Sequence, residues 1–135
     1  MLYRITEIEG IAKTFKAKLA KAEIKTTDDL LKAGATRKGR KELSKKTGLK
    51  EGQLLKWANM ADLLRVKGVG KQYAELLEAS GVDTVKELKA RKADNLAAKM
   101  ADVNKKKKKC KAVPAPSVVA RWVKSAKSMK PKVSH

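Results

Sequence analysis

The sequence of 135 residues has little of what disulfide, metal and cofactor chemistry requires. Its one cysteine, Cys110, cannot form an intrachain disulfide, and its one histidine, His135, is the last residue. These two residues are too few for a zinc site built from cysteine and histidine. No internal histidine is present for acid–base catalysis, and no glycine-rich loop ends in Lys-Ser or Lys-Thr. We therefore expect no metal, no cofactor and no enzymatic activity.

Aromatic residues make up only 4% of the chain, so aliphatic residues must supply the core. Alanine, lysine, leucine and glutamate dominate and β-branched runs are short, which predicts an all-α fold. No apolar stretch approaches the length of a membrane span. Residues 1–10 lack the apolar segment of a signal peptide. We expect an intracellular protein, associated with the nucleoid or nucleus or otherwise cytoplasmic.

Acidic residues are absent from residues 105–135, which carry a net charge of +11. The whole chain has a net charge of +20, and residues 36–61 contribute +6 of it. Residues 1–35 and 62–104 carry only +2 and +1. Such an excess indicates an anionic partner, with nucleic acid first and a membrane surface or acidic protein second. Solubility alone would not require so one-sided a distribution.

The most informative motif is a glycine hairpin at residues 68–70, placed between an apolar helical segment and an amphipathic one. Gly68 and Gly70 flank the apolar Val69, and the same pattern occurs 58 residues earlier at Gly10 and Ile11. Glycines allow positive φ and close backbone approach. The amides that begin the next helix then coincide with the positive end of its dipole, where a phosphate oxygen fits.

Apolar periodicity predicts a series of short helices along the whole chain. They cover about residues 11–22, 28–33, 36–48, 51–62, 71–80, 84–88, 94–103 and 117–129. Expected N-caps are the cluster at residues 27–29, Thr36, Asp83-Thr84 and Ser117, and expected C-caps are Gly34, Gly48 and Gly81. Trp57 and Trp122 are expected to pack between helices, not to stack on bases.

Residues 66–77 match the helix-hairpin-helix pattern of apolar, any, Gly, apolar, Gly, three residues, Ala, two residues, apolar. The arrangement from residue 1 to about residue 130 resembles an uncharacterised family with tandem helix-hairpin-helix repeats. The similar stretches are residues 36–43, residues 54–63 and the closing helix around Trp122. The resemblance implies a helical fold throughout and no established activity.

The motif and the resemblance divide the chain into five parts. They are a first helix-hairpin-helix repeat (1–35), basic connector helices (36–61), a second repeat (62–104), a polybasic and proline linker (105–116), and a C-terminal amphipathic helix with a frayed end (117–135). Two repeats joined by a basic connector, with an added C-terminal helix, are therefore the expected architecture.

The wider motif implies a phosphate-facing set at the second hairpin. This set is Lys67, Gly68, Val69, Gly70 and Lys71, where Val69 either leans on the nucleic-acid groove or plugs the hairpin. The first hairpin departs from the pattern, because Ala12 replaces the second glycine and Glu9 stands where Lys67 stands. We expect it to be structural or a weaker contact, formed by Gly10, Ile11, Ala12 and Lys13. A plain turn between packed helices is the alternative for both hairpins.

Two further basic segments are candidate phosphate contacts, or else solvated surface. The connector contributes Arg37, Lys38, Arg40, Lys41, Lys45 and Lys46. The polybasic run contributes Lys105, Lys106, Lys107, Lys108, Lys109 and Lys111. This run also fits a nuclear localisation signal or a linker.

These features together predict a non-enzymatic protein that binds nucleic acid, duplex DNA before RNA, without sequence preference. Affinity should fall steeply with salt, because each neutralised phosphate releases a counterion. Two alternatives stay open. One is a structural component of a ribonucleoprotein or virion, with a protein partner in a nucleoprotein assembly. The other is a helical adaptor between proteins.

Overall fold

The computed structural model describes residues 4–5, 8, 11, 13–108, 111–130 and 132–133. In this part of the chain all regular elements are helices, and the sole extended pairing is an isolated bridge between Arg4 and Thr26. The all-α prediction is confirmed. The helices are α1 (Lys13–Lys21), α2 (Thr27–Gly34), α3 (Arg37–Thr47), α4 (Glu51–Leu63), α5 (Lys71–Ala79), α6 (Val85–Lys89), α7 (Ala93–Lys107) and α8 (Pro116–Lys127).

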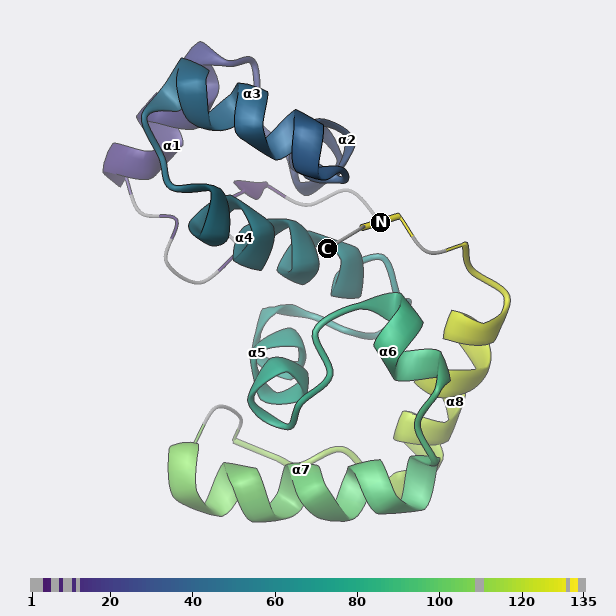
Figure 1. The fold of residues 1–135 in the computed structure, drawn as a ribbon. Coiled ribbons are helices and arrows are strands. Elements are labelled where there is room, and N and C mark those ends of the chain that lie inside the picture. Colours follow the sequence, from purple (N-terminus) through teal and green to yellow (C-terminus); the bar gives the residue numbers. More distant parts are fainter. Residues whose placement is uncertain are drawn as a thin grey trace.

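The helices form two groups with α4 between them (Figure 1). Helices α1, α2 and α3 lie at one end of the molecule, and α5, α6 and α7 lie at the other. Helix α4 contacts α2 and α3 on one side and α5 on the other. Helix α8 packs along α6 and α7, so the end of the chain belongs to the second group.

Because α4 is enclosed by both groups, it is buried on all sides over its second half. Every residue from Trp57 to Leu63 is buried, whereas α3 buries only Arg40 and Leu43. A helix enclosed in this way needs apolar residues all round and not an apolar stripe. Two polar residues, Asn59 and Asp62, are nevertheless buried within α4.

Helix α8 docks through an apolar stripe, as its sequence predicts. Val119, Trp122, Val123 and Ala126 are all buried. Trp122 packs against Tyr73 of α5 with 5.1 Å between ring centroids. The end of α8 is also fastened to the second hairpin, since Arg65 Nη2 donates to the carbonyl oxygen of Lys130 at 3.1 Å.

Five predicted boundaries or caps differ from the structure, and two of them are the N-cap of α2, which is Thr26, and the C-cap of α5, which is Ser80. Residues 105–107 are not a linker but the last turn of α7, because lysine is a good helix former and favours the negative end of the helix dipole. Helix α8 starts at Pro116 with Ala115 as N-cap, so Ser117 lies inside it. Gly34 does not cap α2; it is the last helical residue, and Ala35 takes the C-cap position in the αR region.

The 58-residue spacing of the sequence recurs in the helices. Helices α1 and α5 are both nine residues long and begin 58 residues apart, as do α2 and α6. The N-caps Thr26 and Thr84 keep this spacing, and each accepts a hydrogen bond from the amide three residues later. The turns before α1 and α5 also correspond, since Ile11 N–H donates to Ile8 and Val69 N–H donates to Val66.

Aromatic contacts link α4 to α1 and α8 to α5. Phe15 of α1 packs edge-on against Trp57 of α4 at 5.4 Å between centroids. Tyr73 of α5, 58 residues after Phe15, contacts Trp122 of α8. Helix α8 therefore contacts α5 as α4 contacts α1, through a tryptophan that packs against an aromatic ring.

Candidate nucleic-acid interface

The second hairpin runs from the end of α4 to the start of α5 and is held from inside by Val69. The Val69 side chain is fully buried, and its amide donates to the Val66 carbonyl oxygen at 3.0 Å. Of the two roles predicted for Val69, the structure shows the plug. Its side chain cannot reach a nucleic-acid groove.

The two glycines of the hairpin differ in what surrounds them. Gly68 has φ +91°, and a Cβ added there would lie 3.1 Å from Trp122 Nε1. Glycine is thus required at position 68 by the backbone conformation and by the docking of α8. Gly70 has φ −96°, and a Cβ added there would meet nothing within 4 Å. Packing does not explain the glycine at position 70.

Gly70 is the N-cap of α5, and it offers no side-chain acceptor to the amides of the first turn. Helices α2, α3 and α6 differ in this respect, because Thr26, Thr36 and Thr84 each accept a hydrogen bond from the third residue of their helix. A threonine occupies the N-terminal acceptor position in those three helices, whereas α4, α7 and α8 resemble α5 in having no side-chain cap. At α5 this position is open to an external acceptor.

Three exposed cations belong to the hairpin or to the part of α8 that docks beside it. Lys67 and Lys71 are exposed on either side of the hairpin glycines. Arg121 of α8 is exposed and lines a hollow together with Lys67, Gly68 and Ser125. Arg121 was not among the expected phosphate contacts, because its place beside the hairpin depends on how α8 docks. The sequence signal that identifies it is Trp122, the next residue, which fits against Gly68.

In the connector, one predicted phosphate contact is wrong. Arg40 is 97% buried, since only 3% of its surface is exposed, and its Nη1 donates to the Gly34 carbonyl oxygen at 2.8 Å. Burial lowers the pKa of the Arg40 guanidinium from its usual range, and the neighbouring charge of Arg37 lowers it further. Arg40 therefore donates a hydrogen bond to a carbonyl oxygen at the end of α2, and its side chain is not available to contact nucleic acid.

The other connector cations are exposed along α3. They are Arg37, Lys38, Lys41, Lys45 and Lys46. Thr36 caps this helix through its hydroxyl, which accepts from the Gly39 amide at 3.0 Å, and Gly48 ends it with φ +76°. Both caps agree with the sequence prediction.

The polybasic segment lies at the far end of the molecule from α3. Lys105, Lys106, Lys107, Lys108 and Lys111 are exposed, and Lys109 lies outside the described residues. Figure 1 places α3 at one extreme and α7 at the other, with α4 and α5 between them. The connector set on α3 and the polybasic set after α7 therefore lie at opposite ends of the molecule.

Only part of the first hairpin falls in the described residues. Gly10 and Ala12 lie outside them, Ile11 is buried, and Lys13 begins α1. The buried Ile11 matches the buried Val69, which makes both apolar residues hairpin plugs. The phosphate contacts predicted for this hairpin stay a prediction.

A family model described as "Domain of unknown function (DUF4332)" matches residues 9–129. No curated protein and no solved structure matches the chain. No helix in the described part of the chain has the length and apolar character needed to cross a membrane.

Proposed function

Because this chain belongs to the DUF4332 family, whose description names no activity, we propose a function from its own geometry: it binds the phosphate backbone of nucleic acid without reading base sequence. Duplex DNA is the first candidate and RNA the second. In this proposal the two repeats consist of four helices each, α1–α4 and α5–α8, and the hairpin before α5 positions a phosphate.

The observation that carries the proposal is the open N-terminus of α5 at Gly70. The hairpin presents the first amides of α5 with no side-chain cap, and the space in front of Gly70 is empty. A phosphate oxygen supplies the acceptor that threonine supplies at α2, α3 and α6. Lys67, Lys71 and Arg121 add charge around that position.

Attraction over longer distances comes from other parts of the chain. Residues 62–104, which contain the hairpin, carry a net charge of only +1, whereas residues 36–61 carry +6 and residues 105–135 carry +11. Exposed lysines on α3 and at the end of α7 release counterions from the polyanion and give most of the affinity. The hairpin then sets the position of the protein along the phosphate backbone of the nucleic acid.

Binding of this kind does not depend on base identity. Val69 and Trp122 are both buried, so neither side chain is available to enter a groove or to stack on a base. The remaining donors at the hairpin are backbone amides and long cationic side chains. These groups recognise phosphate geometry, which is shared by all sequences.

Fluorescence anisotropy with random duplex DNA over a salt series tests the proposal. We expect a linear fall of log affinity with log salt concentration, since phosphate contacts release counterions. Gly70→Ala should weaken binding by about tenfold. The alanine Cβ would occupy the space proposed for the phosphate, and the phosphate would then lose one charge-assisted hydrogen bond to the α5 amides. Lys67→Gln should reduce the salt slope by about 1.

Two comparisons make the test specific to the hairpin. Lys21→Gln removes the same charge from the exposed end of α1 and should leave the hairpin contact intact. Salt-independent binding, or equal losses for Lys21→Gln and Lys67→Gln with no effect of Gly70→Ala, would contradict the hairpin assignment. Tighter binding to random RNA than to DNA would replace duplex DNA with RNA as the ligand. Truncation of residues 105–135 is not suitable, because it removes the buried face of α8.

A further inference from the structure

A hollow lies between the second hairpin and α8. In the described part of the chain it is lined by two hairpin residues, Lys67 and Gly68, and by four residues of α8, Val118, Arg121, Trp122 and Ser125. This hairpin hollow has a volume of about 390 Å³, which is far more than one water molecule needs. It therefore has room for a ligand.

One wall of the hairpin hollow carries a hydrogen-bond donor without a partner in the chain. Trp122 is only 2% exposed, yet its indole Nε1 makes no hydrogen bond to a described residue. A buried tryptophan N–H usually finds an acceptor. A Cβ added to Gly68 would lie 3.1 Å from this nitrogen, so the bare glycine leaves the nitrogen edge of the ring uncovered at the wall of the hollow.

This nitrogen is accessible from the hollow. Among the described residues, the one polar side-chain atom that is both fully enclosed and without a partner is Asn59 Oδ1. Trp122 Nε1 also lacks a partner, so it is not fully enclosed. Its acceptor must come from outside the chain and enter through the hairpin hollow.

The charge around the hairpin hollow favours an anion over water as that acceptor. Lys67 lines it from the hairpin and Arg121 lines it from α8, and both side chains are exposed. No acidic residue in the described part of the chain lines it. Ser125, one helical turn after Arg121, adds a hydroxyl on the same side of α8. Cations and N–H or O–H donors of this kind bind phosphate through charge-assisted hydrogen bonds.

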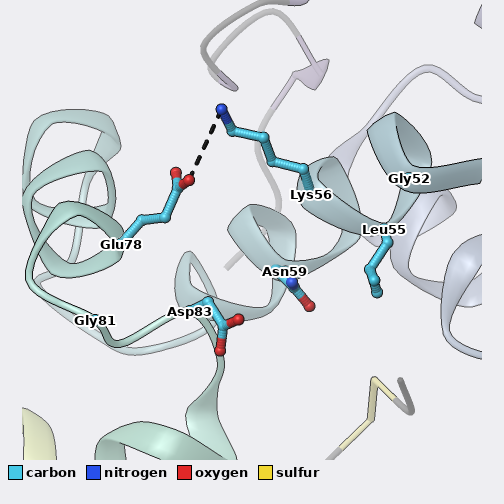
Figure 2. Close-up of a pocket in the computed structure, with 7 residues that line it drawn as sticks. All are labelled: Gly52, Leu55, Lys56, Asn59, Glu78, Gly81 and Asp83. Carbon is cyan, nitrogen blue, oxygen red and sulfur yellow. Dashed lines mark ion pairs between the residues drawn. The ribbon is translucent and has the colours of Figure 1, made fainter.

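A groove between α4 and the loop that joins α5 to α6 differs in this respect (Figure 2). Lys56 Nζ lies 3.7 Å from Glu78 Oε1 there. Asp83 lines the same groove, and the cationic ends of Arg91 and Lys99 lie at its edge. That groove combines charges of both signs, whereas the described lining of the hairpin hollow carries only positive charge.

We propose that the hairpin hollow binds a phosphate group, which accepts from Trp122 Nε1 and pairs with Lys67 and Arg121. As a contact to nucleic acid, this site rests on the function proposed above and adds a second phosphate to the one placed at Gly70. A free phosphate monoester would supply the same chemistry, because these groups recognise the phosphate and not what it is attached to.

Titration of the isotope-labelled full chain with inorganic phosphate, followed by NMR of the indole N–H groups, tests the proposal. The chain has two tryptophans, so each indole gives its own signal. We expect a saturable downfield shift of the Trp122 indole proton as it donates to the anion. The Trp57 indole, which packs against Phe15 in the first group of helices, should not respond.

Two variants with matched charge make the test specific to the hairpin hollow. Arg121→Gln should weaken phosphate binding about tenfold through loss of a charge-assisted contact. Lys127→Gln removes the same charge from an exposed position at the end of α8 and should leave binding unchanged. No saturable shift, an equal shift with sodium chloride at matched ionic strength, or equal losses in the two variants would each overturn the proposal.

Trp122→Phe tests the donor itself. It keeps an aromatic ring against Tyr73 but removes the N–H, so it should weaken phosphate binding, measured at the backbone amides of Lys67 and Arg121. Thermal melts check that the variant folds, and Arg121→Gln carries the test if it does not. Unchanged phosphate affinity in a folded Trp122→Phe chain would remove the indole from the site.

Three ligands distinguish the two sources of the phosphate. A shift of Trp122 with dimethyl phosphate and with random duplex DNA assigns the site to the nucleic-acid backbone. A shift with methyl phosphate but not with the diester or the duplex assigns it to a free phosphate monoester. Duplex binding that needs Gly70 and leaves Trp122 unshifted would support the proposed function without this second contact. Loss of the phosphate shift in Gly70→Ala would overturn the proposal that the two sites are separate.

Discussion

At the scale of single residues, the hairpin shows that two glycines in one motif can be required for different reasons. Gly68 combines φ +91° with a close approach of Trp122, so its role is to let the chain turn and α8 dock. Gly70 has an ordinary φ and empty space around it, so its role lies outside the packed fold. The sequence alone gives both glycines the same role, because Trp122 is distant in the chain.

Alanine substitution at each glycine distinguishes these roles by stability alone. Gly68→Ala should lower the free energy of unfolding by about 1–2 kcal/mol, since a Cβ at positive φ is strained. Gly70→Ala should leave it unchanged or raise it by up to about 1 kcal/mol, because alanine restricts the unfolded chain. Urea denaturation of both variants measures the difference. Equal destabilisation by the two substitutions would refute the distinction.

Arg40 marks a limit of sequence analysis at this scale. It stands among exposed cations on α3, but it lies three residues before Leu43, the other buried residue of this helix, and so shares its face, unlike Arg37 and Lys41. Its burial depends on the packing of α3 against the end of α2, where it donates to Gly34. Helical periodicity places Arg40 on the face of Leu43, but it does not show that the Gly34 carbonyl makes burial of the charge possible.

At the scale of elements, local capping explains why most helix positions were predictable. Thr36 and Gly48 bound α3 through groups that lie within a few residues of the helix ends, and the sequence shows both. A capping box marks the start of α2, and its N-cap, Thr26, lies one residue before the cluster at residues 27–29 that the sequence predicts. Thr26 Oγ1 accepts from the Asp29 amide at 3.1 Å, and Asp29 Oδ2 accepts from the Thr26 amide at 3.2 Å.

This capping box should give α2 a measurable dependence on acid. The Lys25 amide, which donates to the Asp29 carboxylate, lowers the pKa of Asp29 below 3.8, and the Thr26 side chain and amide lower it further. A carboxyl with a lowered folded-state pKa stabilises the fold above its unfolded pKa, and this contribution disappears as pH falls through the folded value. Thermal melts of Asp29→Asn should therefore show a weaker loss of stability below about pH 4 than the parent chain.

Asp28→Asn is the matched control for the capping box. It removes the same charge from the adjacent position, whose carboxylate pairs with Lys32 on the surface at 3.1 Å. Such a surface pair contributes at most about 1 kcal/mol. If Asp28→Asn flattened the acid response as much as Asp29→Asn, the capping box would not be its source.

One buried carboxylate joins the end of α4, the hairpin and the start of α6. Asp62, at the end of α4, is 1% exposed. Its Oδ1 accepts from Arg65 Nη1 at 2.5 Å, and its Oδ2 accepts from the Val85 amide at 2.8 Å at the start of α6. Arg65 in turn donates to Lys130 after α8. The hairpin is thereby attached to the start of α6 and to the segment that follows α8.

Removal of this carboxylate should affect the whole second group. Asp62→Ala is expected to lower the free energy of unfolding by about 3 kcal/mol, because it leaves the Arg65 charge and the Val85 amide unpaired. Asp62→Asn should cost less, since its amide oxygen still accepts from Val85. Urea unfolding followed by tryptophan fluorescence measures both. A loss below about 0.5 kcal/mol in Asp62→Ala, the usual range for surface substitutions, would contradict this role.

At the scale of the whole molecule, the aromatic contacts of α4 and α8 correspond to each other. The sequence predicts two short repeats separated by a connector and followed by a tail. The structure instead places α8 against α5 as α4 lies against α1, each through one tryptophan. The spacing between Trp57 and Trp122 differs from the 58 residues that separate Phe15 and Tyr73. A search at constant spacing therefore does not detect this pair.

Separation of the basic surfaces leads to a further prediction, that one molecule bridges two duplexes. The exposed cations of α3 lie at one end of the molecule, and the hairpin and the end of α7 belong to the other group (Figure 1). If a straight duplex contacts the hairpin without reaching α3, the α3 lysines are available to a second duplex. Capture of fluorescent DNA by bead-bound DNA in the presence of the protein measures this activity.

A variant with Lys38→Gln, Lys41→Gln and Lys45→Gln should lose bridging, because these three lysines follow one exposed stripe of α3. Its binding to a single duplex should also weaken, since the α3 lysines contribute to the affinity, but the hairpin and α7 still bind one duplex. The control changes Lys86, Lys92 and Lys99 to Gln, which removes the same charge from exposed positions in the second group. Equal capture by the two triple variants would mean that total charge determines bridging. Loss confined to the α3 variant would assign the second duplex to α3.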